Sequence, residues 1–249
     1  MLILANDLLC QCKYPDYWSI IKDMPNNIDW CKGMGNRPIL IDCRTYNFCR
    51  LACVKDDNPL GFKTTGVWSK DKLLFEDGKL RIVAKFKGGK SSWPAIWLKN
   101  ANATNKNNYY EIDICEYFEK RKRCKTGLFM PKHLNWGLKR LFRPKKYPKI
   151  KKDDWNVFEC DWDENRIIIT INGKKVLEYK NKGKSDQYPQ TAKDRKFYLI
   201  LSMQYDKKDI LMHKKDLNEL PLYMDIQHIE YYPKDIDNLK YKSFIDYFE

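Results

Sequence analysis

Residues 111–116 read EIDICE, and this stretch is the most informative part of the chain. Its β-branched and apolar residues are typical of a strand, in which side chains two positions apart share a face. Glu111 and Asp113 therefore point the same way, whereas Glu116 would face the opposite side of a regular strand. One extra residue, a β-bulge near residues 114–115, would bring all three acids to one face.

Three neighbouring carboxylates are costly to bury, because like charges disfavour one another's ionised form unless a metal ion or a shared proton relieves them. The alternative is an exposed acidic strand face, which suits any one of these acids better than all three together. Apolar residues flank the acids on both sides along the stretch. We therefore interpret the trio as a site of chemistry.

Short alternating or β-branched runs recur outside this stretch, separated by turn residues. They lie at 39–43, 48–54, 79–86, 93–99, 109–117, 155–162, 166–171, 175–179, 197–204 and 223–232. The dipeptide Asn172-Gly173 favours a type I′ hairpin turn, because both positions tolerate positive φ. Long amphipathic helices are missing, apart from a short candidate at 236–248. So many strands predict an all-β sandwich of two antiparallel sheets.

The composition suits one folded domain. Of the 249 residues, 43% are hydrophobic, which is enough to bury a sizeable core. The sequence contains neither an internal repeat nor a Gly/Ser linker, so we expect residues 1–249 to form a single domain. Eight Trp and sixteen Tyr are more than a core needs, and such residues often line sugar-binding or protein-binding surfaces.

The chain is strongly basic, with 47 Lys and Arg against 33 acidic residues and a net charge of +14. Such a surface attracts polyanions, namely nucleic acid, anionic lipid or acidic polysaccharide, or it serves solubility alone. Two tracts, 120–125 (KRKRCK) and 139–152 (KRLFRPKKYPKIKK), are expected as exposed loops. No helix-turn-helix, RNP or zinc-finger pattern occurs, so we expect no nucleic-acid partner.

Nine cysteines form no CxxC pair, and only three histidines accompany them. The odd number argues against a complete disulfide framework, and the spacing argues against a zinc site. We expect mostly reduced, buried thiols and synthesis in a reducing cytoplasm. The N-terminal MLILANDLLCQC is not typical of a signal peptide, and no apolar run is long enough to span a membrane, so no membrane partner is expected.

The EIDICE stretch resembles the E-[I/V]-D-x-x-E signature of glycoside hydrolase family 16. Residues 93–98 (WPAIWL) are similar to the family's Trp-Pro-Ala-Phe-Trp-Leu strand, which precedes that signature. Other matching segments occur in the family's order, at 66–70, 77–85, 155–162, 172–173, 197–201 and 224–232. The resemblance covers residues 36–232 and leaves 233–249 as a C-terminal extension.

The resemblance implies a β-jelly roll of the concanavalin A-like lectin and glucanase type, with an open glycan cleft. It also implies a retaining endo-β-glycanase in which Glu111 is the nucleophile, Asp113 the assisting acid and Glu116 the general acid/base. Such enzymes hold two carboxyl groups about 5–5.5 Å apart, so that one attacks the anomeric carbon while the other protonates the leaving oxygen. The polysaccharide partner would be a β-glucan or a galactan, neutral or anionic.

Two tryptophans are candidates for sugar binding. Trp93 and Trp97 lie four positions apart on the strand expected at 93–99, on one face with Ala95. Sugar rings expose apolar C–H faces that stack on aromatic side chains, so we assign both tryptophans to the cleft. A core position is the alternative for each, and it is as strong as the cleft position for Trp97.

Four further residues complete the predicted site. By the resemblance, His133 and Trp136 lie where the family carries a cleft histidine and an aromatic residue. A structural role is the alternative for His133, because a lone histidine often has one. Ser202 and Gln204 alternate outward on the strand expected at 197–204, where they could hydrogen-bond sugar hydroxyls.

The chain also departs from the family pattern. Arg81 and Val83 stand where the family commonly has an acidic residue and an arginine, and Ser202 replaces a frequent asparagine. These changes leave the three acids intact and put the identity of the sugar in doubt. The resemblance implies no required cofactor and no metal at the acids. It admits a structural calcium ion, for which Asp225 is the candidate.

Two other classes of function stay open. A non-catalytic glycan-binding sandwich would keep the aromatic residues but has no need of three clustered acids. A basic nucleic-acid-binding protein would account for the charge alone. An extracellular polysaccharide substrate conflicts with the missing export signal. A phage or viral origin would resolve the conflict, because the protein would then be released on lysis or carried on the particle. We expect a monomer.

Overall fold

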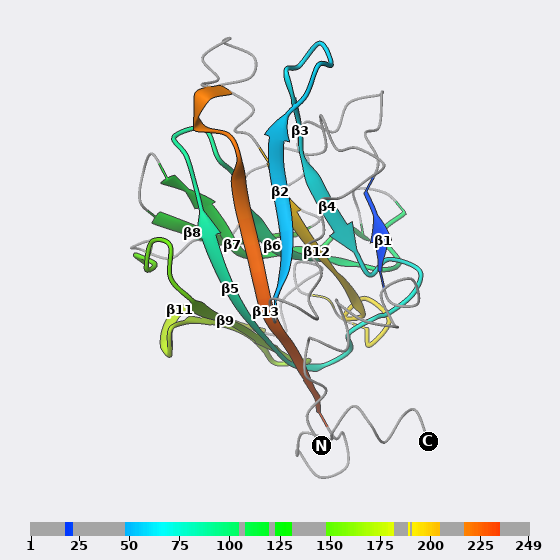
Figure 1. Ribbon diagram of the computed structural model, residues 1–249. Coiled ribbons are helices and arrows are strands. Elements are labelled where there is room, and N and C mark those ends of the chain that lie inside the picture. The colour runs from blue at the N-terminus through cyan, green and yellow to red at the C-terminus, as the bar shows by residue number, and fades with distance from the viewer. Residues whose placement is uncertain are drawn as a thin grey trace.

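The computed structural model describes residues 18–21, 48–104, 108–119, 123–130, 148–181, 189, 191–204 and 217–234. Within these ranges the chain forms strands and a short 3-10 helix at Leu217–Glu219, and no described residue is in an α-helix. None of the helical residues described forms a segment long and apolar enough to cross a membrane. The strands make two antiparallel sheets that lie as layers, with β2, β5 and β13 in front of β6, β7 and β12 in Figure 1.

One sheet has six strands in the order β1-β4-β12-β6-β7-β8, and all neighbours are antiparallel. Its strands are β1 (Ser19–Ile20), β4 (Thr65–Trp68), β12 (Phe197–Met203), β6 (Ala95–Asn100), β7 (Glu111–Phe118) and β8 (Arg123–Phe129). The predicted EIDICE strand is therefore an inner strand, between β6 and β8.

The other sheet has seven strands in the order β11-β10-β9-β5-β13-β2-β3. Its strands are β11 (Lys174–Lys180), β10 (Arg166–Ile171), β9 (Asn156–Trp162), β5 (Gly78–Lys87), β13 (Leu222–Pro233), β2 (Cys49–Lys55) and β3 (Phe62–Lys63). Asn172 and Gly173 connect β10 to β11 with φ of 50° and 73°, which confirms the predicted hairpin. The two sheets confirm the predicted all-β sandwich.

The main core fills the space between the sheets. Leu199 and Leu201 of β12 are fully buried there with Ile82 of β5 and Phe158 of β9. Every residue of β12 is buried, because its other face also packs against side chains. A second, smaller cluster on that face contains Ile21, Ala95, Trp97, Tyr198 and Ile200. Trp97 therefore lies on the opposite face of the six-stranded sheet from the main core.

Two sequence-based expectations are wrong in the described residues. Residues 123–125 were expected in an exposed loop, but they begin β8, where Cys124 points into the core and is fully buried. The thiols were expected to be mostly reduced. Cys115 instead forms a disulfide with Cys124, across 5.4 Å between Cα atoms, and Cys49 is also disulfide-bonded. The spacing could not show this, because the pair depends on the β7–β8 register.

The other described cysteines, Cys53 and Cys160, are free and buried, and burial raises the pKa of both thiols. Several predicted segments lie outside the described residues. These are the strand at 39–43, the helix at 236–248 and most of the basic tract at 139–152.

Candidate active site

A β-bulge in β7 brings the three acids to one face, as the sequence predicted. On the β6 side Asp113 pairs with Trp97 and Cys115 with Ile96, so Ile114 is the extra residue. On the β8 side the register shifts between Asp113 and Glu116. Because Ile114 and Cys115 both point into the main core, the side chain of Glu116 returns to the side of Asp113.

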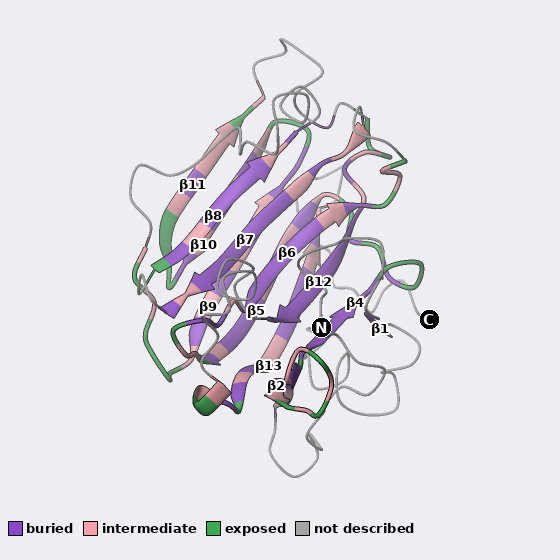
Figure 2. Cartoon of the chain, turned by 90° about the horizontal axis from the view of Figure 1, so that it is seen from above, coloured by how far each residue is buried: buried purple, intermediate pink, exposed green. Residues whose placement is uncertain are grey.

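The acids differ in their burial. Asp113 is 4% exposed and Glu116 is 8% exposed, whereas Glu111 at the start of β7 is of intermediate exposure. Figure 2 shows β7 as an inner ribbon between β6 and β8, buried over most of its length. The acids lie in rows across the sheet, with Glu111 opposite Lys99 and Glu116 opposite Ala95. Two acids are thus largely withdrawn from water, which strengthens electrostatic interactions at this face.

Trp93 fixes one oxygen of Glu116. Its indole Nε1 donates a hydrogen bond to Oε1 of Glu116 at 3.1 Å. The Trp93 ring also stacks on Phe118, with 5.9 Å between ring centroids, and the Lys125 ammonium lies 4.1 Å from the Phe118 centroid. The carboxyl group is therefore held beside two aromatic rings and near a cation on β8.

Glu111 has a different environment. The Tyr109 hydroxyl donates a hydrogen bond to its Oε2. Burial, followed by the charge of Glu111, raises the pKa of Tyr109, so the hydroxyl stays protonated as a donor. The Lys99 ammonium lies 4.7 Å from the Tyr109 ring centroid. Burial lowers the pKa of Lys99 and the charge of Glu111 opposes that shift, so the two charges act on each other.

The sequence did not single out Tyr109 or Lys99. A signal was present for each: Tyr109 lies two positions before Glu111, and Lys99 lies two positions after Trp97. Because side chains two apart share a strand face, the same alternation that selected Trp97 extends to Lys99.

The remaining predicted residues fall on the same sheet where they are described. Trp97 is the cross-strand partner of Asp113 and is 7% exposed. Ser202 is the partner of Ala95, in the row of Glu116. The Gln204 carbonyl accepts a hydrogen bond from the Trp93 backbone N–H at 2.6 Å. The Gln204 side-chain amide is buried, and neither of its polar atoms has a hydrogen-bond partner within the described part of the chain. His133 and Trp136 lie outside the described residues.

Asp225 does not fit the calcium site that the resemblance admits. Arg50 donates to both of its carboxylate oxygens, at 2.6 and 2.8 Å, and Lys85 lies 3.6 Å away. Both carboxylate oxygens of Asp225 are thus already paired with cationic side chains, so this residue does not fit as a calcium ligand. Among the residues that the structure describes, no group of three or more His, Cys, Asp or Glu side chains is arranged to hold a metal ion.

The chain is similar to several carbohydrate-active proteins. It is 28% identical over 152 residues to a keratan-sulfate endo-1,4-beta-galactosidase of Sphingobacterium multivorum, which covers 58% of this chain and 34% of that protein. The chain thus spans about a third of the length of this curated relative.

Two solved structures share the fold. One, of endo-acting O-glycanases of the human gut microbiota, has a TM-score of 0.72 at 18% identity and covers 93% of this chain and 97% of that one. The other is SCLam, a non-specific endo-beta-1,3(4)-glucanase from family GH16, with a TM-score of 0.70 at 16% identity over 93% and 90%. They confirm the jelly roll that the resemblance to glycoside hydrolase family 16 implied.

A family model also matches residues 37–212, a range that includes β7 and all three acids. This match covers well over half of the chain. The chain belongs to the 3-keto-alpha-glucoside-1,2-lyase-like domain family.

Proposed function

We propose that the protein is an endo-acting retaining glycoside hydrolase that cleaves internal β-linkages of a polysaccharide. The observation that carries the proposal is the β7 bulge, which puts Glu111, Asp113 and Glu116 on one face of the sheet beside Trp93 and Trp97. A bulge that aligns three acids at a partly buried site costs free energy, and function is the physical reason to keep it.

The double displacement assigns one role to each glutamate. Glu111 attacks the anomeric carbon and forms a glycosyl ester, while Glu116 gives its proton to the leaving oxygen. Glu116 then takes a proton from water, whose oxygen attacks the same carbon and releases Glu111. Trp93 positions Glu116 through its indole N–H, and the Tyr109 hydroxyl positions Glu111. Asp113 lies between the two and adjusts the proton affinity of both.

The cleft residues have complementary roles in this proposal. Trp93 and Trp97 stack on sugar rings, while Ser202 and Gln204 hydrogen-bond sugar hydroxyls. The buried amide of Gln204 would gain partners from the substrate, and a buried polar group without partners is costly. His133 and Trp136 are further substrate-binding candidates.

The relatives support internal cleavage of a glycan. The curated relative is named for endo action on keratan sulfate, and the solved structures are endo-glycanases. We propose a β-glucan or galactan substrate, residues 1–249 acting as one domain and monomer, no required cofactor, and no nucleic-acid partner. We also retain the proposal of release on lysis or carriage on a viral particle.

The family description favours a second candidate, elimination from a 3-keto-α-glucoside. In that reaction a base removes the C2 proton beside the keto carbon, and an acid protonates the group that leaves C1. No water is consumed, and the product carries a double bond between C1 and C2. The same carboxylates can act as base and acid, so the product distinguishes the two reactions.

One experiment tests both candidates. The protein is incubated in H₂¹⁸O with laminarin, lichenan, agarose, porphyran, carrageenan and keratan sulfate, and separately with a 3-keto-α-glucoside. Hydrolysis puts ¹⁸O on the new reducing end of a polymer fragment. Elimination gives an unsaturated product without ¹⁸O, detected by its ultraviolet absorbance. Activity on the keto-glucoside with none on any polymer would overturn the first proposal.

A further inference from the structure

Lys99 of β6 lies next to the proposed nucleophile. In the β6–β7 ladder Lys99 is directly opposite Glu111, so the two side chains leave the same face of the sheet from neighbouring strands. On its other side Lys99 is opposite Tyr198 of β12. The neighbour of Glu111 on β8 is Phe129, which carries no charge. Lys99 is therefore the cation that faces Glu111 across the ladder.

The Lys99 side chain also reaches Glu111 through Tyr109. Its ammonium lies 4.7 Å from the centroid of the Tyr109 ring, within the range of a cation–π interaction. The Tyr109 hydroxyl in turn donates a hydrogen bond to Oε2 of Glu111. A cation over the ring draws electron density from it, which makes the hydroxyl a stronger donor. Lys99, Tyr109 and Glu111 thus form a connected chain between β6 and β7.

The charges in this chain act on one another. Burial lowers the pKa of Lys99, and the charge of Glu111 opposes that shift. Glu111 thus favours the protonated form of Lys99. Because such a coupling is reciprocal, Lys99 favours the ionised form of Glu111 to the same extent. A nucleophilic carboxyl group needs that form, and the like charge of Asp113 on the same face of β7 works against it.

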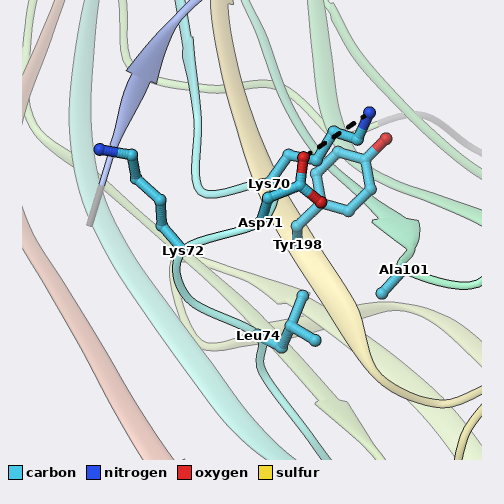
Figure 3. Close-up of a pocket in the computed structure, with 6 residues that line it drawn as sticks. All are labelled: Lys70, Asp71, Lys72, Leu74, Ala101 and Tyr198. Carbon is cyan, nitrogen blue, oxygen red and sulfur yellow. Dashed lines mark ion pairs between the residues drawn. The ribbon is translucent and has the colours of Figure 1, made fainter. Parts of the chain in front are cut away.

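The other titratable groups around Lys99 do not replace it. Besides burial, the charge of Lys70 in the connection between β4 and β5 also lowers the pKa of Lys99. Figure 3 shows Lys70 beside the Tyr198 ring and paired with Asp71, at 3.9 Å. The Lys70 and Asp71 side chains are 44% and 84% exposed, so water screens their effect on Glu111. Tyr198 is a neutral phenol, because burial and then the charges of Asp71 and Glu111 raise its pKa.

We propose that Lys99 is a positioning residue for the nucleophile, which keeps the Glu111 carboxylate ionised and oriented through its own charge and through the Tyr109 ring. This role rests on the proposed function and adds the cation on which the attack by Glu111 depends. In this role Lys99 forms no bond with the sugar and exchanges no proton in the reaction. Its removal should therefore change the protonation of Glu111 and leave the role of Glu116 intact.

The first measurement needs no substrate. The full chain is labelled with ¹³C at its glutamate side-chain carboxyl groups, and the Glu111 resonance is identified by its loss in Glu111→Gln. Its NMR shift is then followed against pH. Lys99→Met should move the titration midpoint of Glu111 up by about one pH unit, because a nearby opposite charge favours the ionised carboxyl group. Lys99→Arg keeps the charge and should restore the wild-type midpoint.

A matched control lies on the other sheet. The Lys87 ammonium of β5 lies 5.3 Å from the ring centroid of Tyr223, and Lys87 is exposed at the end of its strand. Lys87→Met therefore removes the same charge from the same kind of contact. It should leave the Glu111 midpoint unchanged, and circular dichroism verifies that each variant folds.

The Tyr109 ring is tested in a double-mutant cycle. In a chain that carries Tyr109→Phe, Lys99→Met should move the Glu111 midpoint by less than it does in the wild-type chain, because the hydroxyl that carries part of the effect is missing. Equal shifts in the two chains would overturn the contribution of the Tyr109 hydroxyl.

Activity gives a further readout. On the best polymer from the panel, the acid limb of the kcat/KM profile should move to higher pH in Lys99→Met by the same amount as the NMR midpoint. A merely structural role would instead lower kcat/KM to the same extent at every pH, which would contradict the role proposed for Lys99.

The outcomes separate this role from the proposed function. An unchanged midpoint in folded Lys99→Met, or equal shifts in Lys99→Met and Lys87→Met, would overturn the role of Lys99 and leave the hydrolase in place. A shifted midpoint in a chain that cleaves no polymer would support the coupling of Lys99 to Glu111 and reject the hydrolase. A shifted midpoint with a matching shift of the acid limb would support both.

Discussion

Buried carboxylates on the seven-stranded sheet meet cations on neighbouring strands. Glu230 of β13 lies 2.6 Å from Arg81 of β5. Arg50 of β2, the strand on the other side of β13, donates hydrogen bonds to both carboxylate oxygens of Asp225. On β7 of the six-stranded sheet, two of the acids accept hydrogen bonds from neutral groups, Glu116 from the indole of Trp93 and Glu111 from the hydroxyl of Tyr109.

The difference matters for chemistry. A carboxylate that pairs with arginine on a neighbouring strand is held by a charge-assisted contact that links the two strands. A neutral donor orients one oxygen and leaves the group able to gain and lose a proton. The acids of the seven-stranded sheet therefore link neighbouring strands, and we propose that those of β7 serve nucleophilic attack and proton transfer.

The largest expected effect is on turnover. Glu111→Gln and Glu116→Gln each remove a covalent or proton-transfer step and should lower kcat by at least about 100-fold, with Asp113→Asn lowering it less. Steady-state rates on the best polymer measure this, and circular dichroism verifies folding. Glu159→Gln on β9 is the matched control and should leave kcat unchanged. A Glu111 or Glu116 variant with near wild-type turnover would refute the assignment.

The second effect is on stability. Arg50→Met leaves the carboxylate of Asp225, which is 2% exposed, with Lys85 alone at 3.6 Å. The free energy of unfolding should fall by about 3 kcal/mol, because a buried charge loses its main partner. Urea unfolding measures the loss, and kcat of the folded variant should match wild type. An Arg50→Met chain that is equally stable would show that this pair is not structural.

A smaller effect is expected at Trp93. Trp93→Phe keeps an aromatic ring against Phe118 but removes the N–H that holds Glu116, so kcat should fall by about tenfold. Trp155→Phe makes the same chemical change next to the seven-stranded sheet, where Trp155, the residue before β9, packs against Phe48, the residue before β2. It should leave kcat unchanged. Equal effects of the two substitutions would mean that the indole N–H does not position Glu116.

The smallest effect is on the pH dependence of stability. Burial raises the pKa of Glu159, but hydrogen bonds from Lys79 and Thr170 outweigh it and leave the pKa below its ordinary value. A lowered pKa stabilises the folded chain above the unfolded-state pKa of about 4.3, and this contribution disappears as pH falls through the folded-state value. Glu159→Gln should therefore lower Tm at pH 7 and converge with wild type at low pH. A constant Tm difference down to acid pH would contradict the shift.

Local patterns in the sequence predicted much of this arrangement. The bulge was predicted because Glu116 lies five positions after Glu111 and would face the opposite side of a regular strand. The structure confirms the bulge, with Ile114 as the extra residue. The Asn172-Gly173 turn likewise followed from backbone chemistry. Both predictions needed only residues close in sequence.

Features that depend on strand pairing were missed. Residues 123–125, at the start of β8, were interpreted as part of an exposed loop because Arg123 and Lys125 obscure the alternation that buries Cys124 between them. The Cys115–Cys124 disulfide depends on the β7–β8 register, and the Lys99–Glu111 row depends on the β6–β7 register. The arginine fork on Asp225 joins positions 175 residues apart, which no local pattern shows. Whether Asp225 could bind calcium therefore could not be judged from the sequence alone.

The most direct test of the central claim is the anomeric configuration of the first product. With the best polymer from the panel, ¹H NMR within the first minutes of reaction distinguishes the two anomers before they equilibrate. Attack by Glu111 and then by water inverts the anomeric carbon twice, so the account predicts that the β-anomer appears first and the α-anomer grows in only by mutarotation. Initial appearance of the α-anomer would mean a single displacement by water, and Glu111 would not be the nucleophile.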